Sequence, residues 1–195
     1  MSNLVEKLRT YLRVAQALPQ LRRYVVLGMF DGIVVTLSLI ITADVGNLGL
    51  RILWASVISS LVGVAVASAW NTVQAELLER MTELRKIERT LLRPLRGTVL
   101  DRAHKVSIVL CSLVHALSPL AGLVLVVLYE YLKYAAPELA LPITVASAGA
   151  ILGSLGGMYV GELKTSDIAK LSLLMASATI GLVIILMFLF KFKSI

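Results

Sequence analysis

Few residues in this 195-residue sequence are charged, and it is poor in cysteine and histidine. Charged residues make up 16% of the chain, whereas a soluble domain carries about 25%. One cysteine, Cys111, excludes an intrachain disulfide and any metal site built from several thiolates. Two histidines, His104 and His115, are too few for a histidine-rich metal site. The composition therefore excludes a cytosolic enzyme, a disordered tail and a secreted disulfide scaffold.

The sequence is instead rich in apolar residues, which make up 58% of it and give a mean hydropathy of +0.87. A membrane-spanning helix needs about 20 mostly apolar residues. Five runs satisfy this requirement, and they cover residues 24–43, 52–75, 106–129, 139–160 and 171–190. The runs are continuous rather than alternating, which favours helices over a β-barrel. We therefore predict an all-α integral membrane protein with five transmembrane helices.

Lysine and arginine are distributed unevenly between the two ends of these spans. Five precede the first span, eight lie between the second and third, and two lie between the fourth and fifth, which makes fifteen against four on the other side. Cytoplasmic loops of membrane proteins carry the excess of Lys and Arg. We therefore expect a multi-pass protein of a prokaryotic cell membrane, with its N-terminus in the cytoplasm and its C-terminus outside. Topology then explains the net charge of +7, and nucleic acid is not an expected partner.

The segment before the first span has a helical pattern of its own. We predict that residues 1–23 form an amphipathic cytoplasmic helix, lying on lipid or on the bundle, and that residues 24–195 form the transmembrane domain. Pro19 is expected to separate this helix from the first span. Its apolar positions follow helical spacing at Leu4, Leu8, Tyr11, Ala15 and Leu18.

A second segment outside the spans, residues 76–105, joins the second span to the third. No helix breaker follows residue 74 for a dozen residues, so we expect the second span to continue as an amphipathic helix in the cytoplasm. Pro94 and Gly97 indicate a turn, and a short helix from about Thr98 is expected to lead into the third span.

Asp31, within the first span, is the most informative residue. A carboxylate in the hydrocarbon region costs several kcal/mol unless it is neutralised, paired or hydrated, and such residues often mark an ion or proton path. Ser38 and Thr42 share its helical face, and Asn71 belongs to a stripe of small and polar residues on the second span. We predict that Asp31, Ser38, Thr42 and Asn71 line a polar route. The alternative is that these stripes are packing seams.

Small residues at four-residue spacing predict close helix packing. Gly28 and Gly32 have this spacing in the first span. The fourth span carries a longer series, which consists of Gly149, Gly153, Gly157 and Gly161.

The first-span sequence from Gly28 to Thr36, GMFDGIVVT, resembles the opening of the first span in the vacuolar iron transporter family. That family has five spans, a cytoplasmic N-terminus and a helical cytoplasmic segment after the second span. A proline-containing stretch in its third span is similar to residues 116–120 here. The resemblance implies a homodimer that exports Fe²⁺ or Mn²⁺ from the cytoplasm in exchange for protons, with Asp31 as a metal ligand in the path.

The family also collects metal ions on an acidic cytoplasmic segment, and Glu76, Glu79 and Glu83 are the corresponding carboxylates on one face of a helix. Their arginine neighbours leave a second interpretation open, in which these glutamates form ion pairs on a solvated helix. His115, with Cys111 on the same face, is a candidate proton relay or metal ligand. It is equally a candidate for a hydrogen bond to a neighbouring serine.

The sequence departs from the family in the second span, where residues 67–72 read ASAWNT and lack the family's methionine and glutamate. Gln20 likewise replaces a glutamate before the first span. A second hypothesis is therefore a transport-inactive membrane scaffold or regulatory relative of the family. A third is a transporter of another cation or small solute. Enzymatic activity is not predicted, because serine, histidine and carboxylate residues follow no recognisable catalytic order.

Overall fold

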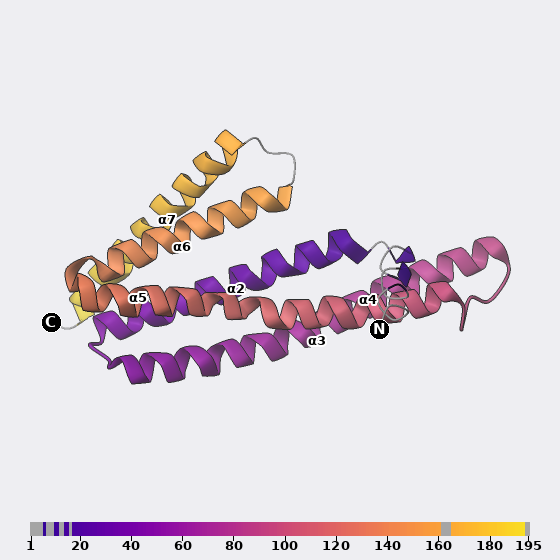
Figure 1. Cartoon of the computed structure of the whole chain (residues 1–195), viewed down its shortest axis with the longest axis horizontal. Helices are drawn as coiled ribbons and strands as arrows, with labels where there is room; N and C mark the ends of the chain where they lie inside the picture. The colour runs from indigo at the N-terminus through magenta and orange to yellow at the C-terminus, as the bar shows by residue number, and fades with distance from the viewer. Residues whose placement is uncertain (1–5, 7–9, 12–13, 16, 161–164, 194–195) are drawn as a thin grey trace. The chain divides into compact units, whose positions relative to one another are not determined.

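The computed structural model of the chain describes all residues except 1–5, 7–9, 12–13, 16, 161–164 and 194–195 (Figure 1). The described part is almost wholly helical and contains no strand. The predicted all-α class is therefore confirmed. Packing divides the chain into two compact units, which are Met1–Gly28 with Ala65–Ser118 (unit 1) and Met29–Val64 with Pro119–Ile195 (unit 2). Helices α2 (Ala17–Val45) and α3 (Leu50–Leu91) contribute residues to both units.

In unit 1, α3 is one uninterrupted helix from the predicted second span into the segment that follows it. It ends at Leu91, and Leu92 has a left-handed backbone with φ of 50°. The amide of Arg93 then donates to the carbonyl of Glu88 at 3.3 Å, which closes the helix in a Schellman motif. This end lies close to the turn expected at Pro94 and Gly97.

Helix α4 (Val99–Leu117) begins where the sequence indicated a helix start. Thr98 is its N-cap, and the Thr98 hydroxyl accepts a hydrogen bond from the Asp101 amide. The Asp101 carboxylate in turn accepts from the Gly97 amide at 2.9 Å and from Lys105 at 3.0 Å. Gly97 has φ of 79°, a conformation that suits glycine.

The expected break at Pro19 is wrong. Helix α2 begins at Ala17, so Pro19 occupies its first turn, where the missing N–H would have had no helical partner. In the preceding segment the described positions are mostly helical, and Ala15 and Ala17 are buried with Ala103 of α4, with Tyr11 packed against them. This part of the N-terminal segment therefore packs on the protein itself.

The third predicted span is not a single α-helix. A short 3₁₀ segment, η1 (Ser118–Gly122), separates α4 from α5 (Leu123–Ala135). Pro119 explains the interruption, because it lacks the amide that a continuing α-helix would use. Unit 2 continues with α6 (Pro137–Val160) and α7 (Thr165–Lys193), and Figure 1 shows these two running antiparallel.

The seam between α6 and α7 is formed by glycines. A Cβ added to Gly149 would lie 2.3 Å from the Ala176 Cα, and one on Gly153 would lie 2.2 Å from the Ser172 Cα. Gly157 meets the side chain of Ile168 in the same way. The two backbones are therefore as close as small residues permit. Gly161 lies outside the described residues.

Four helical stretches in the described chain are long and apolar enough to cross a membrane, namely Ala17–Val45, Leu50–Leu91, Val99–Ala135 and Pro137–Gly157. Their outward faces carry large apolar side chains, among them Ile58, Val62 and Val66 of α3, which fit contact with lipid. The predicted fifth span lies within α7, and 13 of the 29 side chains of that helix fall outside the description, so the count of five stays a prediction. The described helices support a multi-pass membrane protein.

Candidate functional site

Three of the predicted pathway residues form an exposed polar stripe on α2. Asp31, Ser38 and Thr42 are all exposed on the same face of that helix. The Ser38 hydroxyl donates to the Val34 carbonyl at 2.9 Å, and the Thr42 hydroxyl donates to the Ser38 carbonyl at 2.8 Å. The Asp31 carboxylate has no hydrogen bond or ion pair within the part of the chain that is described. Asp31 is thus an acidic residue on an apolar helix that no described residue neutralises.

The other face of α2 packs closely on the interrupted third span. A Cβ on Gly32 would lie 2.0 Å from the Pro119 carbonyl oxygen, and one on Gly122 would lie 2.4 Å from the Gly32 carbonyl oxygen. Thr36, one turn beyond Gly32, is fully buried on this face. In unit 1, a Cβ on Gly28 would lie 2.6 Å from the Ser118 Cβ. These close approaches fix which side of α2 is buried and leave Asp31 on the outward side.

Asn71, the pathway residue predicted on the second span, is exposed on α3 in unit 1. Its neighbours in sequence point elsewhere, because Ser68 and Thr72 are buried. The backbone carbonyl of Ala69 accepts a hydrogen bond from Ser112 of α4 at 3.1 Å. This stretch of α3 thus divides between an outward polar residue and residues that hold α4. The role of Asn71 in a polar route stays a prediction.

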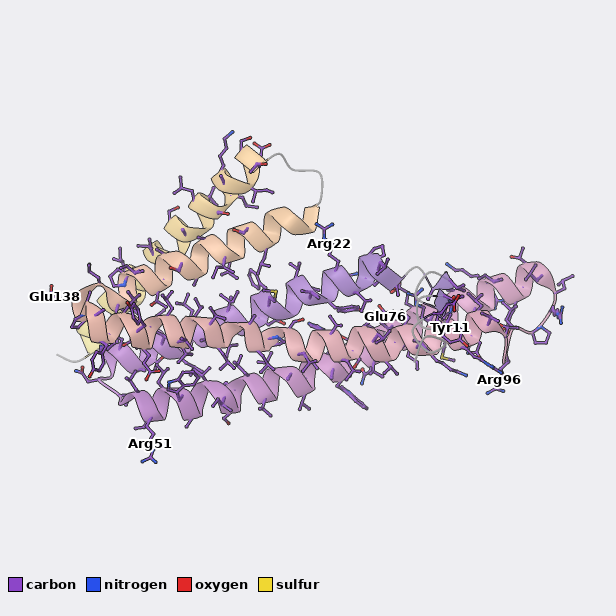
Figure 2. All side chains as sticks on the ribbon, in the orientation of Figure 1. Tyr11, Arg22, Arg51, Glu76, Arg96 and Glu138 are labelled. Atoms are coloured by element: carbon purple, nitrogen blue, oxygen red, sulfur yellow. The ribbon has the colours of Figure 1, made fainter. Side chains whose placement is uncertain are left out.

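Glu76, which is labelled in Figure 2, is buried, with 1% of its surface exposed, and neighbouring side chains contact its carboxylate. The Tyr24 hydroxyl of α2 donates to one carboxylate oxygen at 3.0 Å, and the Arg80 Nε lies 3.4 Å from the other. Arg80 is itself buried and also contacts Glu83, at 3.1 Å, and Gln20 of α2. This buried ion-pair cluster joins α2 to α3 through Tyr24, Gln20, Glu76 and Arg80.

The three predicted metal-collecting glutamates therefore have different environments. Glu76 is buried, Glu79 is exposed, and Glu83 is half exposed, 3.8 Å from the Nε2 of His104 on α4. The guanidinium of Arg80 lies between Glu76 and Glu83, where a bound cation would otherwise be expected. No group of three or more His, Cys, Asp or Glu side chains in the described chain is arranged to hold a metal ion. The contacts of Glu76 and Glu83 match the ion-pair interpretation.

His115 contacts a threonine of another helix. Its Nδ1 lies 2.6 Å from the Thr72 Oγ1 of α3, and its ring lies 5.2 Å from the ring of Tyr24. Cys111, one turn away, is fully buried near Ser107. The Thr72 contact links α3 to α4, so His115 has a structural role in unit 1.

Sequence reasoning missed a second polar cluster, which lies in unit 2. Asp44 of α2 accepts hydrogen bonds from the Tyr129 hydroxyl at 2.5 Å and from the Lys133 ammonium at 2.6 Å, both on α5. The Trp54 indole of α3 donates to the Glu130 carboxylate of α5 at 2.9 Å. A signal was present, because opposite charges stand at the ends of two predicted spans, Asp44 after the first and Lys133 after the third. These contacts fasten α5 to α2 and α3.

Electrostatics also mark the turn before α4, outside the predicted spans. The hydrogen bond from the Gly97 amide, with the Lys105 ammonium beside it, lowers the pKa of Asp101 below its ordinary value of 3.8. Asp101 is therefore ionised at neutral pH and caps the start of α4. The contact is local and identifies Asp101 as a capping residue rather than a ligand.

No family model, curated protein or solved structure matches the chain.

Proposed function

We propose that the protein is a homodimeric transporter that moves a divalent metal ion, Fe²⁺ or Mn²⁺, out of the cytoplasm in exchange for protons. One observation carries the proposal: Asp31 lies exposed on an apolar helix and has no partner in the described chain. The resemblance of residues 28–36 to the first span of vacuolar iron transporters supports it. The proposed orientation, with the N-terminus in the cytoplasm, follows from the distribution of Lys and Arg.

A second copy of the chain supplies what one chain lacks. A charged side chain facing hydrocarbon costs several kcal/mol, so it is found facing protein or water. If two copies pair through the exposed polar stripe of α2, Asp31, Ser38 and Thr42 of each copy face those of the other. The stripe then offers two carboxylates with hydroxyl and backbone oxygens beside them, which are ligands that hard divalent cations accept. The glycine face of α2 stays buried within each copy.

Exchange for protons follows from the chemistry of a carboxylate. Asp31 holds either a metal ion or a proton, and the two compete for the same oxygens. In the proposed cycle Asp31 is ionised when it faces the cytoplasm and binds the metal ion. It releases the ion outside and returns protonated. The Asp31 carboxylate is therefore paired with a metal ion on the outward step and with a proton on the return step, so it does not cross the membrane as an unpaired charge.

Flux measurements on the full chain in proteoliposomes test this proposal. Fe²⁺, Mn²⁺ and Co²⁺ are offered in turn, with a pH reporter sealed inside the vesicles. We expect metal flux with opposing proton flux in the wild type and neither in Asp31→Asn. Asp167→Asn is the matched control, because Asp167 pairs with the exposed Lys170 in the first turn of α7. Loss of flux in both variants, or in neither, would contradict a specific role for Asp31.

Cross-linking tests the dimer separately. Cys111 is the single cysteine and is buried, so Cys111→Ser gives a background without thiols. In that background we expect Ser38→Cys to yield a covalent dimer under mild oxidation. Val109→Cys, on an exposed position of α4, should remain monomeric on denaturing gels. Equal cross-linking at both positions would indicate random collision rather than pairing through α2.

A scaffold or regulatory subunit is the second candidate, and the second span favours it. Ser68 and Thr72 are buried, and Thr72 and the Ala69 carbonyl are bonded to α4, so these groups are not available to an ion. Absence of flux for every ion tested, with the Ser38→Cys dimer intact, would support this candidate over a transporter.

A further inference from the structure

The end of α3 bears a hollow that the proposed transport does not use. Its volume is about 330 Å³, and it is lined by Arg85, Glu88, Arg89, Leu92, Arg93 and Pro94. The backbone shapes it, because the left-handed turn at Leu92 directs the chain back across the last turns of the helix. One oxygen of Glu88 accepts a hydrogen bond from the Leu95 amide at 2.7 Å, which holds the loop residues after Leu92 against the end of the helix. We call this feature the arginine hollow.

The three arginines of the hollow have no acidic partner in the described chain. None of their side chains forms an ion pair or a hydrogen bond there, although Glu79 and Glu83 lie on the same helix. Arg80, only five residues before Arg85, contacts two carboxylates and an amide. Arg80 therefore has carboxylate partners, whereas no described side chain pairs with the three arginines of the hollow.

The local charges favour an anion. Three guanidinium groups contribute three positive charges, and the Glu88 carboxylate contributes one negative charge. The carboxyl end of a helix adds roughly half a negative charge, which opposes an anion. The sum stays positive by about one and a half charges. Like charges at four-residue spacing also repel one another, so a bound anion relieves this repulsion.

Phosphate is the anion that this geometry fits best. The planar guanidinium donates two parallel hydrogen bonds, and these match the oxygens of a phosphate group. Arg85 and Arg89 lie four residues apart on α3, about 6 Å along its axis, so they can contact adjacent phosphates. Arg93 lines the hollow from the loop that follows the helix. The volume lies at the lower end of small-molecule sites, which are about 300–1,000 Å³. We propose that the arginine hollow binds a soluble anion that carries a diphosphate group.

Its distance from the predicted membrane distinguishes a soluble anion from a lipid headgroup. Arg89 lies fourteen residues beyond the predicted end of the second span at residue 75. At 1.5 Å per residue the helix carries it about 21 Å further. A headgroup layer is about 5–7 Å thick on each side, so lipids of the same bilayer do not reach the hollow when α3 stands along the membrane normal. The distance of about 21 Å depends on the predicted end of the second span and does not depend on metal transport.

Titration with inorganic pyrophosphate tests the proposal. The full chain is purified in a neutral detergent and titrated calorimetrically in metal-free buffer, so that no metal complex contributes. We expect one molecule bound per chain and about tenfold weaker binding by Arg89→Gln. Arg102→Gln is the matched control, because it removes the same charge from an exposed position of α4 outside the hollow. It should bind as the wild type does.

Glu88→Gln is expected to change the affinity for pyrophosphate in the opposite direction. The glutamine amide oxygen still accepts from the Leu95 amide, while the negative charge is lost. We expect pyrophosphate to bind several-fold more tightly. Tighter binding by this variant, with weaker binding by Arg89→Gln, identifies an electrostatic site at this hollow. Unsaturable binding, or equal affinity in wild type and Arg89→Gln, overturns the proposal.

Nanodiscs distinguish the two sources of phosphate. The titration is repeated in discs of phosphatidylcholine and in discs made of equal parts phosphatidylcholine and phosphatidylglycerol. Equal affinity in both, after correction for the measured surface potential, supports a soluble anion. Loss of pyrophosphate binding in the anionic discs, restored in the neutral ones, would mean that lipid headgroups occupy the hollow. That result would overturn the assignment to a soluble ligand.

Discussion

Unit 1 and unit 2 hold their helices together by different means. In unit 1 the buried ion pair of Glu76 and Arg80 joins the helices, beside an apolar contact of Ala15 and Ala17 with Ala103. In unit 2 the longest seam consists of glycines, at which α6 and α7 meet backbone to backbone. Buried charge and close packing are both costly to disturb, but for different physical reasons. Charge needs its partner, and close packing needs the absence of side chains.

One acidic residue of each unit, Glu76 in unit 1 and Asp31 in unit 2, has a different environment. Glu76 is almost completely buried and has a tyrosine hydroxyl and an arginine beside it. Asp31 is exposed and has no partner in the described chain. An acid with an internal cation is occupied, whereas an acid without one is available to a cation or proton from outside. The contrast gives Glu76 a structural role and makes Asp31 the residue on which the proposed function depends.

Substitution of Arg80 is expected to cause the largest loss in the free energy of unfolding. Arg80→Met leaves Glu76 buried without its cation, and losing one partner of a buried ion pair costs about 3–5 kcal/mol. The double variant Glu76→Gln with Arg80→Met removes both charges and should recover most of this loss. Unfolding in mixed detergent micelles, followed by far-UV circular dichroism, measures both. If the double variant is no more stable than Arg80→Met, the pair is not what holds unit 1 together.

The second effect concerns the glycine seam of unit 2. Gly153→Ala places a Cβ 2.2 Å from the Ser172 Cα, where no side chain can move aside. Overpacking of this kind costs about 1–3 kcal/mol. Gly156→Ala is the control on the same helix, because its nearest neighbour would be a flexible Leu171 methyl at 3.5 Å. It should be neutral or stabilising, since alanine favours a helix over glycine by about 1 kcal/mol.

Features that depend on neighbours in sequence were predictable. The glycine spacing of the fourth span indicated a packing seam, and the structure places Gly149, Gly153 and Gly157 against α7. The turn near Pro94 and the start of α4 after Thr98 also follow from local chemistry. The error at Pro19 was local too, because a proline is compatible with the first turn of a helix.

Features that depend on packing between helices were not predictable. Tyr24 meets Glu76 across 52 positions, Thr72 meets His115 across 43, and Lys133 meets Asp44 across 89. Helical periodicity tells which residues share a face, but not which face meets which. The sequence therefore marked Glu76 and Asp31 alike as acids on helices, and the contacts alone separate them.

A small effect is expected at the margin of unit 1, where Asp101 caps α4. Its pKa is lowered by the Gly97 amide and by Lys105, so the folded state favours the ionised form. Its contribution to stability is therefore present above the ordinary value of 3.8 and is lost as the pH falls through the lowered pKa. Asp101→Asn should melt slightly below the wild type at neutral pH, and the difference should vanish in acid. A difference that is constant with pH would exclude ionisation as the cause.

The smallest expected change in stability is at Asp31, and it sharpens the contrast with Glu76. Asp31→Asn breaks no hydrogen bond or ion pair of the described chain, so its free energy of unfolding should stay within about 0.5 kcal/mol of the wild type. Glu76→Gln, measured alongside, should lose stability, because it leaves the buried Arg80 with the half-exposed Glu83 as its remaining ion-pair partner. A large loss in Asp31→Asn would show that this carboxylate has an internal partner after all, and its flux defect would then no longer indicate a transport site.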